Sequence, residues 1–100
     1  MQLEQFHHER FTRLLQSEFL VMDEPVSAFP ITLVDVGNHA ITPHQESFSV
    51  IFLGPVNNFI PQGIHKLNHQ EMGEIDIFLV PIALDKAGFR YEAVFNRLIL

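Results

Sequence analysis

The stretch "IPQGIHKLNHQEMGEIDIFLVPI", residues 60–82, holds two histidines, three acidic residues and two proline-flanked apolar runs. Such a mixture fits a metal or catalytic site, but it also fits a well-patterned β-hairpin. We interpret it as strands over residues 63–68 and 74–82, joined by a turn in which Gly73 takes the positive-φ position that closes such loops.

Charge and apolarity predict the register of this hairpin. Pairing Asn68 with Glu74 gives one apolar face near the turn and an opposite-charge pair on the other face. A shift by one residue would oppose Leu67 to Asp76, which places a charge against an aliphatic side chain. The predicted cross-strand pairs are Lys66–Asp76, Leu67–Ile75 and Ile64–Phe78.

A second hairpin follows directly. Residues 85–88, "DKAG", form a turn with Gly88 at a positive-φ position, and they join residues 76–84 to a last strand over residues 89–98. Both strands are apolar on both faces at their centres, whereas a strand wetted on one side would alternate. We therefore expect both faces to be covered, one by the opposing part of the sheet and the other by an N-terminal helix.

The N-terminal segment, residues 3–16, has the period of an amphipathic helix. Glu9 and Arg13 lie four residues apart, in the favourable order for a helical ion pair. Apolar residues share one arc of this helix, with Phe6 at its edge: Leu3, Phe11, Leu14 and Leu15. A helix this short is marginal alone, so we expect it to dock on the rest of the domain.

Between the helix and the hairpins, short β-prone runs alternate with turn residues. The predicted strands are residues 18–22, 29–36, which Gly37 and Asn38 end, and 47–53, which Gly54 and Pro55 end. The sequence thus predicts a mainly β domain of the α+β class, with an N-terminal helix and a five- to six-stranded antiparallel sheet in a roll or small barrel. One hundred residues without a linker or repeat indicate a single domain over residues 1–100.

Composition argues against several classes of protein. With a net charge of −6 and scattered basic residues, the chain lacks the basic stripe of proteins that bind nucleic acids or anionic membranes. It has no cysteine, which excludes disulfides, thiol catalysis, zinc fingers and iron–sulfur clusters. No apolar run approaches the roughly 20 residues of a membrane span and no signal peptide is recognised, so we expect a cytoplasmic protein.

His65 and His69 have the H-x-x-x-H spacing of helical zinc sites, but the pattern around them is that of a strand. Four residues of extended strand span ~13 Å, too far for two ligands of one ion at ~2 Å. We therefore expect no shared metal and no cofactor. His65 is expected to pack between Leu67 and Ile77, and His69 to lie in the exposed turn.

The other histidines are weaker candidates. His7 and His8 lie on the predicted helix, His7 within its apolar arc, and would be boundary residues or form a pH-sensitive contact. His39 and His44 lie with Glu46 in the loop predicted between the second and third strands. There they would be solvated or form a weak surface metal contact.

Motifs for catalysis do not occur in the sequence: no serine stands in a G-x-S-x-G context, and there is no glycine-rich phosphate loop. Paired carboxylates could come from Asp76 with Glu92, or from Asp35, although Asp76 is already expected to pair with Lys66. Glu92 and Asn96 are the polar residues that we expect to point inward from the last strand.

The loop of residues 54–63 is the best candidate for binding, because it is longer than the usual ~4–6 residues of a strand connection. Its candidate contact residues are Asn57, Asn58, Phe59 and Gln62. The alternative is a compact Ω-type loop whose Phe59 and Ile60 pack against the body and cap one end of the sheet.

The stretch "PQGIHKLNHQEMGEIDIFLVPI", with the later "GFRYEAVFN", resembles a family of short bacterial domains of unknown function. The likeness follows the element order over residues 3–98 and is most specific over residues 48–96. No catalytic residue follows from it, since the family has no established activity. It singles out Pro61, Gln62, Gly63, His69, Gly73, Pro81, Tyr91, Glu92 and Asn96, of which Gln62, Glu92 and Asn96 have no obvious structural reason.

Three hypotheses about function remain open. The first, which we favour, is a non-enzymatic structural or protein-interaction domain that acts through a sheet edge or the 54–63 loop, or as a small homo-oligomer. The second is a barrel that binds a small apolar ligand in a phenylalanine-lined interior, although five or six strands usually fill their own interior. The third is a small hydrolase or isomerase that uses His65, Glu92 and Asn96.

Overall fold

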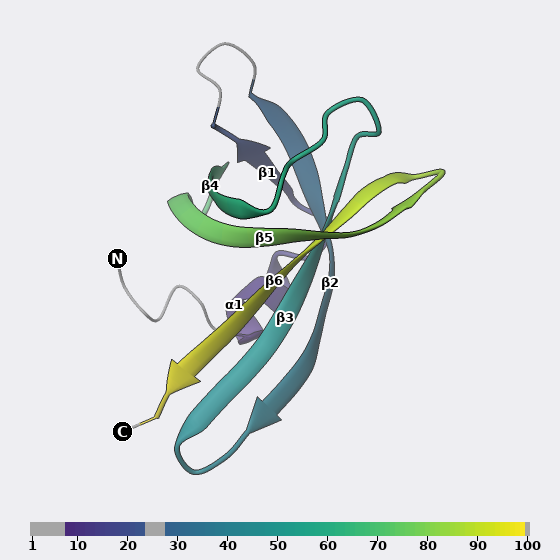
Figure 1. The fold of residues 1–100 in the computed structure, drawn as a ribbon. Helices are drawn as coiled ribbons and strands as arrows, with labels where there is room; N and C mark the ends of the chain where they lie inside the picture. Colours follow the sequence, from purple (N-terminus) through teal and green to yellow (C-terminus); the bar gives the residue numbers. More distant parts are fainter. Residues whose placement is uncertain (1–7, 24–27, 100) are drawn as a thin grey trace.

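A computed structural model describes residues 8–23 and 28–99 of the chain (Figure 1). Within these residues one short helix precedes six strands. The elements are α1 (His8–Arg13), β1 (Glu18–Val21), β2 (Phe29–Ile41), β3 (Gln45–Gly54), β4 (Gly63–His69), β5 (Gly73–Asp85) and β6 (Gly88–Leu98). No helix among the described residues is long and apolar enough to cross a membrane.

The strands form one antiparallel ring in the order β1-β2-β3-β6-β5-β4, which confirms the mainly β fold class. A short pairing closes it, with Leu20 opposite Asn68 and Val21 opposite Leu67. The ring is not a regular barrel, because β5 pairs with β4 through its first half and with β6 through its second. Strands β2, β3 and β6 extend together to one end of the molecule, and β1, β4 and β5 lie at the other (Figure 1).

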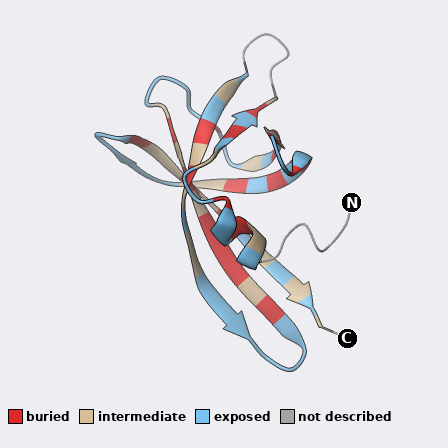
Figure 2. Cartoon of the chain, turned by 180° about the vertical axis from the view of Figure 1, so that it is seen from behind, coloured by how far each residue is buried: buried red, intermediate tan, exposed pale blue. Residues whose placement is uncertain are grey.

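The predicted hairpin register is confirmed for β4 and β5, whose pairs include Leu67–Ile75 and Ile64–Phe78. Buried and less buried residues alternate along β4 and along the first half of β5, which pairs with it (Figure 2). Lys66 and Asp76 form the expected ion pair across the outer face, with Nζ and Oδ1 3.6 Å apart. Gly73 has φ 72°, as the turn requires.

The expectation that both faces of β5 are covered is wrong. Phe78, Ile82 and Leu84 of β5 are 50%, 49% and 61% exposed. Helix α1 does not reach them, because it packs on the β2–β3–β6 side of the ring. The tip of the β5–β6 hairpin projects away from the body (Figure 1).

Helix α1 is shorter than the predicted helix within the described residues, because a turn follows Arg13. Phe11 is fully buried, with its ring centroid 5.2 Å from that of Phe95 and 5.8 Å from that of Phe48. Leu14 is also buried, but Leu15 lies beyond the helix and is 36% exposed, against expectation. The expected positions of Leu3, Phe6 and His7 lie outside the described residues.

Strand β2 runs past Gly37 and Asn38, which were expected to end it. Asn38 takes a positive φ of 55°, and the pairing with β3 shifts between Gly37 and Ala40 before it resumes. The two residues therefore form a β-bulge, which absorbs a turn-prone dipeptide without ending the strand. The loop predicted after Asn38 is instead paired strand with a tight turn at residues 42–44.

Buried side chains of the strands form one hydrophobic core inside the ring, and Figure 2 marks the buried residues along the strands. Its fully buried members include Phe19, Ile31, Leu33, Val50, Phe52, Leu67, Leu79 and Tyr91. A ring of this size normally fills its own centre. Nothing in this packed interior supports the hypothesis of an apolar ligand bound inside the barrel.

Candidate functional site

The loop between β3 and β4 is held by two hydrogen bonds. The N–H of Ile60 donates to the hydroxyl of Tyr91 at 3.0 Å, and the Ile60 side chain is 2% exposed. The carbonyl of Pro61 accepts a bond from Nε2 of His65 at 2.6 Å. Burial raises the pKa of the Tyr91 phenol, while the Ile60 bond acts in the opposite direction. The loop is thus anchored on β6 and β4 at two successive residues.

The residue before these anchors points outward. Phe59 is 56% exposed, although it was expected to pack against the body as Ile60 does. Its ring packs edge-to-face on Phe89, a partly buried residue at the rim of the core, with ring centroids 5.1 Å apart. Asn57, Asn58 and Gln62 are also exposed, so the loop presents one aromatic ring among three side-chain amides.

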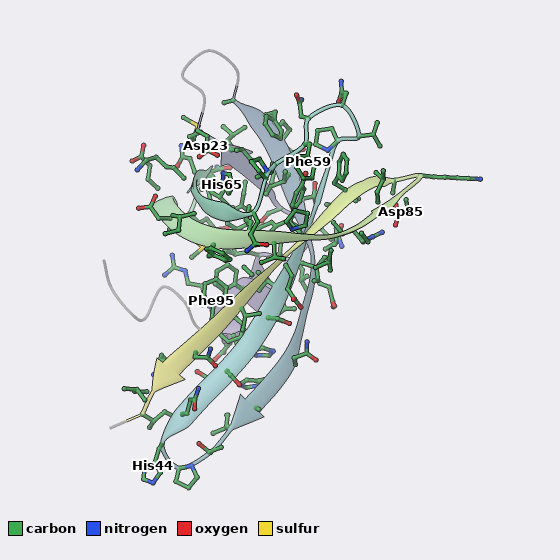
Figure 3. The ribbon with its side chains drawn as sticks, viewed as in Figure 1. Asp23, His44, Phe59, His65, Asp85 and Phe95 are labelled. Carbon is green, nitrogen blue, oxygen red and sulfur yellow. The ribbon has the colours of Figure 1, made fainter. Side chains whose placement is uncertain are left out.

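A small cavity of about 180 Å³ lies beside Phe59. Three of the residues that line it, Asp23, Phe59 and His65, are labelled in Figure 3. Its walls are mostly apolar, and an aspartate–histidine pair provides the polar groups. The lining residues are Val21, Asp23, Phe29, Phe59, Ile60, Pro61 and His65. The loop therefore places the exposed aromatic ring of Phe59 next to a cavity of similar size.

His65 packs opposite Ile77 and is 8% exposed, as predicted. Its Nδ1 contacts the carboxylate of Asp23, whose other oxygen accepts the N–H of Lys66 at 3.0 Å. Nε2 faces the Pro61 carbonyl, so both ring nitrogens lie against oxygen atoms. These contacts connect the residues after β1, strand β4 and the loop.

Glu92 and Asn96 lie on the outer face of β6, so their expected inward orientation is wrong. The flanking residues Tyr91 and Ala93 fill the inner face, and strand geometry then directs Glu92 outward. Asn96 is exposed and its Oδ1 accepts a bond from Gln45 at 3.0 Å. The structure therefore does not bring His65, Glu92 and Asn96 together.

His69 is 4% exposed rather than solvated in the turn, because the turn folds over it. Its Nδ1 accepts the N–H of Glu71 at 2.9 Å and that of Met72 at 3.4 Å. Nε2 must then carry the proton, and it donates to the hydroxyl of Ser17 at 2.8 Å. Ser17 donates in turn to the carbonyl of Leu14 at 2.5 Å. In a catalytic pair the serine hydroxyl donates to the histidine, whereas here the histidine donates to the serine.

Burial lowers the pKa of His69 below its ordinary value of 6.5; the smaller effect of Glu71 opposes this lowering and that of Arg10 adds to it. Between the lowered pKa and 6.5 the unfolded chain binds a proton that the folded chain does not, so stability should fall as pH drops below 6.5. His69→Gln should reduce this slope by up to about 1.4 kcal/mol per pH unit in urea unfolding.

Ser17→Ala is the matched control. Because it leaves His69 buried, the free energy of unfolding should depend on pH as steeply as in the wild-type protein. An unchanged slope in His69→Gln would contradict the assignment.

A second buried polar cluster lies where α1 meets β2 and β3. Glu46 is 8% exposed, and its Oε1 accepts bonds from Nη2 and Nε of Arg97 at 2.8 and 3.1 Å. Its Oε2 lies 2.7 Å from Nε2 of His39. The His39 bond, followed by that of Arg97, holds the pKa of Glu46 below its ordinary value. His8 stacks on His39 with ring centroids 3.9 Å apart.

The remaining candidates do not form a catalytic or metal site in the described residues. Asp35 and Glu92 flank Ile51 on two different strands, so they are ~10 Å apart. His44 is exposed at the β2–β3 turn, two residues before Glu46, and takes no part in the hydrogen bonds of that cluster (Figure 3). No three His, Asp or Glu side chains of the described part are arranged to hold a metal ion.

A family model described as "Domain of unknown function (DUF6916)" matches residues 6–95. The chain belongs to this family. No curated protein and no solved structure matches the chain. The family match agrees with the resemblance to a domain of unknown function, while the sequence motif and a bacterial origin stay predictions.

Most residues that the resemblance singled out have structural roles. Tyr91 and the Pro61 carbonyl anchor the loop, and His69 holds the β4–β5 turn. Gly63 and Gly73 both have positive φ. Sequence reasoning missed the contacts of Asp23 with His65, Ser17 with His69 and Arg97 with Glu46. These residues are 42, 52 and 51 positions apart, so no local spacing could indicate them.

Proposed function

We propose that this domain is a non-enzymatic interaction module that pairs with a second copy of itself through the 54–63 loop. Phe59 carries the proposal: its ring is 56% exposed, yet the next two residues are fixed by Tyr91 and His65. An aromatic side chain held on a rigid support loses little conformational entropy on binding, which is typical of interface hot spots.

The recess beside Phe59 supports a second copy as the partner. Its volume of about 180 Å³ is sufficient for a phenyl ring, since apolar cavities of about 150 Å³ accept benzene. A surface that carries both a ring and a recess for that ring is complementary to itself. Two copies related by a two-fold axis could each insert Phe59 beside the other copy's Phe29.

The closed ring favours the loop over a sheet edge. Every strand of the described residues has two neighbours in the ring, so no terminal strand offers its backbone along its whole length. Asn57, Asn58 and Gln62 surround Phe59 with side-chain amides, which suits the polar rim of a small interface. The net charge of −6 opposes self-association, so added salt should strengthen it.

Sedimentation velocity over about 10 µM to 1 mM protein tests the proposal, because small interfaces give weak affinities. The mass should rise from 11.5 kDa towards twice that value with concentration. Phe59→Ser should keep the protein monomeric. Phe78→Ser is the matched control, since Phe78 is 50% exposed on the outer face of β5, and it should still dimerise.

A wild-type protein that stays monomeric throughout this range would overturn the proposal. Loss of the dimer in Phe78→Ser but not in Phe59→Ser would move the interface to the outer sheet face and reject the loop.

A further inference from the structure

A larger cavity, of about 530 Å³, opens between α1 and the β2–β3 hairpin. The β2–β3 turn lies at the opposite end of the molecule from the 54–63 loop (Figure 1). The lining residues that matter here are His8, Glu9 and Arg13 from α1, His39 and Ile41 from β2, and Glu46 from β3.

His39 differs from the two buried histidines in having a ring nitrogen to spare. Nε2 faces the ionised Glu46 at 2.7 Å and must donate to it. Its Nδ1 has no hydrogen-bond partner in the described part of the chain, and the side chain is 32% exposed. Glu46 and the stacked ring of His8 fix the orientation of this imidazole.

Arg13 supplies a cation that forms no ion pair with a carboxylate of residues 8–23 or 28–99. The helical ion pair expected between Glu9 and Arg13 is not formed, and Arg13 has no ion pair among the described residues. Glu46 is unavailable to it, because Arg97 already occupies one carboxylate oxygen and His39 the other. Arg13 therefore lines the cavity without a side-chain hydrogen bond or ion pair to any other described residue.

We propose that this cavity binds the phosphate group of a small organic phosphate monoester. Arg13 donates to two phosphate oxygens, and His39 Nδ1 contacts a third. A neutral ring accepts from the P–OH of a phosphate monoanion, and a charged ring donates to P–O⁻. With a second pKa of about 6, a phosphate monoester still carries a P–OH on part of its molecules near neutral pH, whereas a carboxylate carries no hydroxyl there.

The size of the cavity and its other lining residues indicate that the ligand carries an organic group besides the phosphate. The cavity is much larger than one phosphate group, and Ile41 with the stacked rings of His8 and His39 offers apolar and planar surface. Glu9 is exposed at the rim and repels the anion. Removal of its charge should therefore strengthen binding, the reverse of the effect at Arg13.

Titration of the ¹⁵N-labelled protein with phenyl phosphate, and separately with inorganic phosphate, tests the proposal by amide chemical shifts. Saturable shifts should centre on Arg13, His39 and Ile41, with phenyl phosphate bound more tightly. Arg13→Gln should weaken binding about tenfold or more. Glu9→Gln should strengthen it roughly twofold.

Arg10→Gln is the matched control. Arg10 lies on the same helix and carries the same charge, but it bonds to the carbonyl of Glu71 and does not line this cavity. Its loss should change the affinity by less than about twofold. Equal weakening by Arg10→Gln and Arg13→Gln would show unspecific charge attraction and overturn the site. Shifts that do not saturate would overturn it as well, and tighter binding of inorganic phosphate would reject the organic ligand.

Discussion

Replacement of Gly88 by alanine should destabilise the domain by about 3–5 kcal/mol, because the new methyl group would meet backbone rather than a movable side chain. A Cβ on Gly88 would lie 2.0 Å from the carbonyl oxygen of Gly54, and the residue has φ 142°. Neither the clash nor the backbone strain can relax without separating β6 from the end of β3, where Gly54 pairs with Phe89.

Gly73→Ala is the matched control for this substitution. Gly73 also closes a hairpin with positive φ, 72°, but a Cβ on this residue would have nothing within 4 Å. The substitution should cost only the conformational term of about 1–2 kcal/mol. Urea unfolding of both variants gives the comparison, and equal losses would contradict the close contact between the β5–β6 turn and Gly54.

Phe11→Ala should also destabilise the domain strongly, by about 3–5 kcal/mol, because it empties a fully buried site. The ring of Phe11 connects α1 to Phe48 and Phe95 on the extended β3–β6 part of the sheet. Its loss should therefore undock α1 as well as leave a cavity. Protection of α1 amides from hydrogen exchange should fall more than protection of the β4–β5 hairpin.

Leu15→Ala separates this effect from a general loss of apolar surface. The sequence placed Leu15 on the same arc as Phe11, but it is 36% exposed beyond the end of α1. Its replacement should cost less than about 1 kcal/mol. Comparable losses in the two variants would mean that the helix continues beyond Arg13 and buries both residues.

The sequence was most informative where the deciding contacts are local. Residues of the β4–β5 hairpin lie close along the chain, so charge pairing and apolar alternation were enough to predict Lys66 opposite Asp76. Gly73 could be placed for the same reason, since its conformation depends only on the turn. The mainly β class followed from the succession of such short segments.

Prediction failed where a residue's surroundings depend on how the six strands close into a ring. Apolar runs in β5 and β6 were taken to mean two covered faces, but the helix packs on the opposite side and leaves Phe78 exposed. The inward placement of Glu92 failed because only the register against β3 shows that Tyr91 fills the inner face. Gly37 and Asn38 formed a bulge because β3 continues beside them and restores the pairing.

In the 54–63 loop, one prediction is confirmed and another is wrong at adjacent residues. Its length indicated a candidate binding segment, and Asn57, Asn58, Phe59 and Gln62 are exposed. Burial of Ile60 was predicted, but that of Phe59 was not borne out. The difference arises from Tyr91, which is 31 residues away and fixes the Ile60 amide so that the preceding side chain faces outward.

The central claim is that Tyr91 and His65 make this loop a rigid support for an exposed Phe59. Backbone ¹⁵N relaxation of the amides in residues 57–62 tests it most directly, using the wild-type protein below its association range. We predict order parameters of about 0.85, equal to those of the flanking strands. Values below about 0.6 would show a flexible loop and would contradict the account.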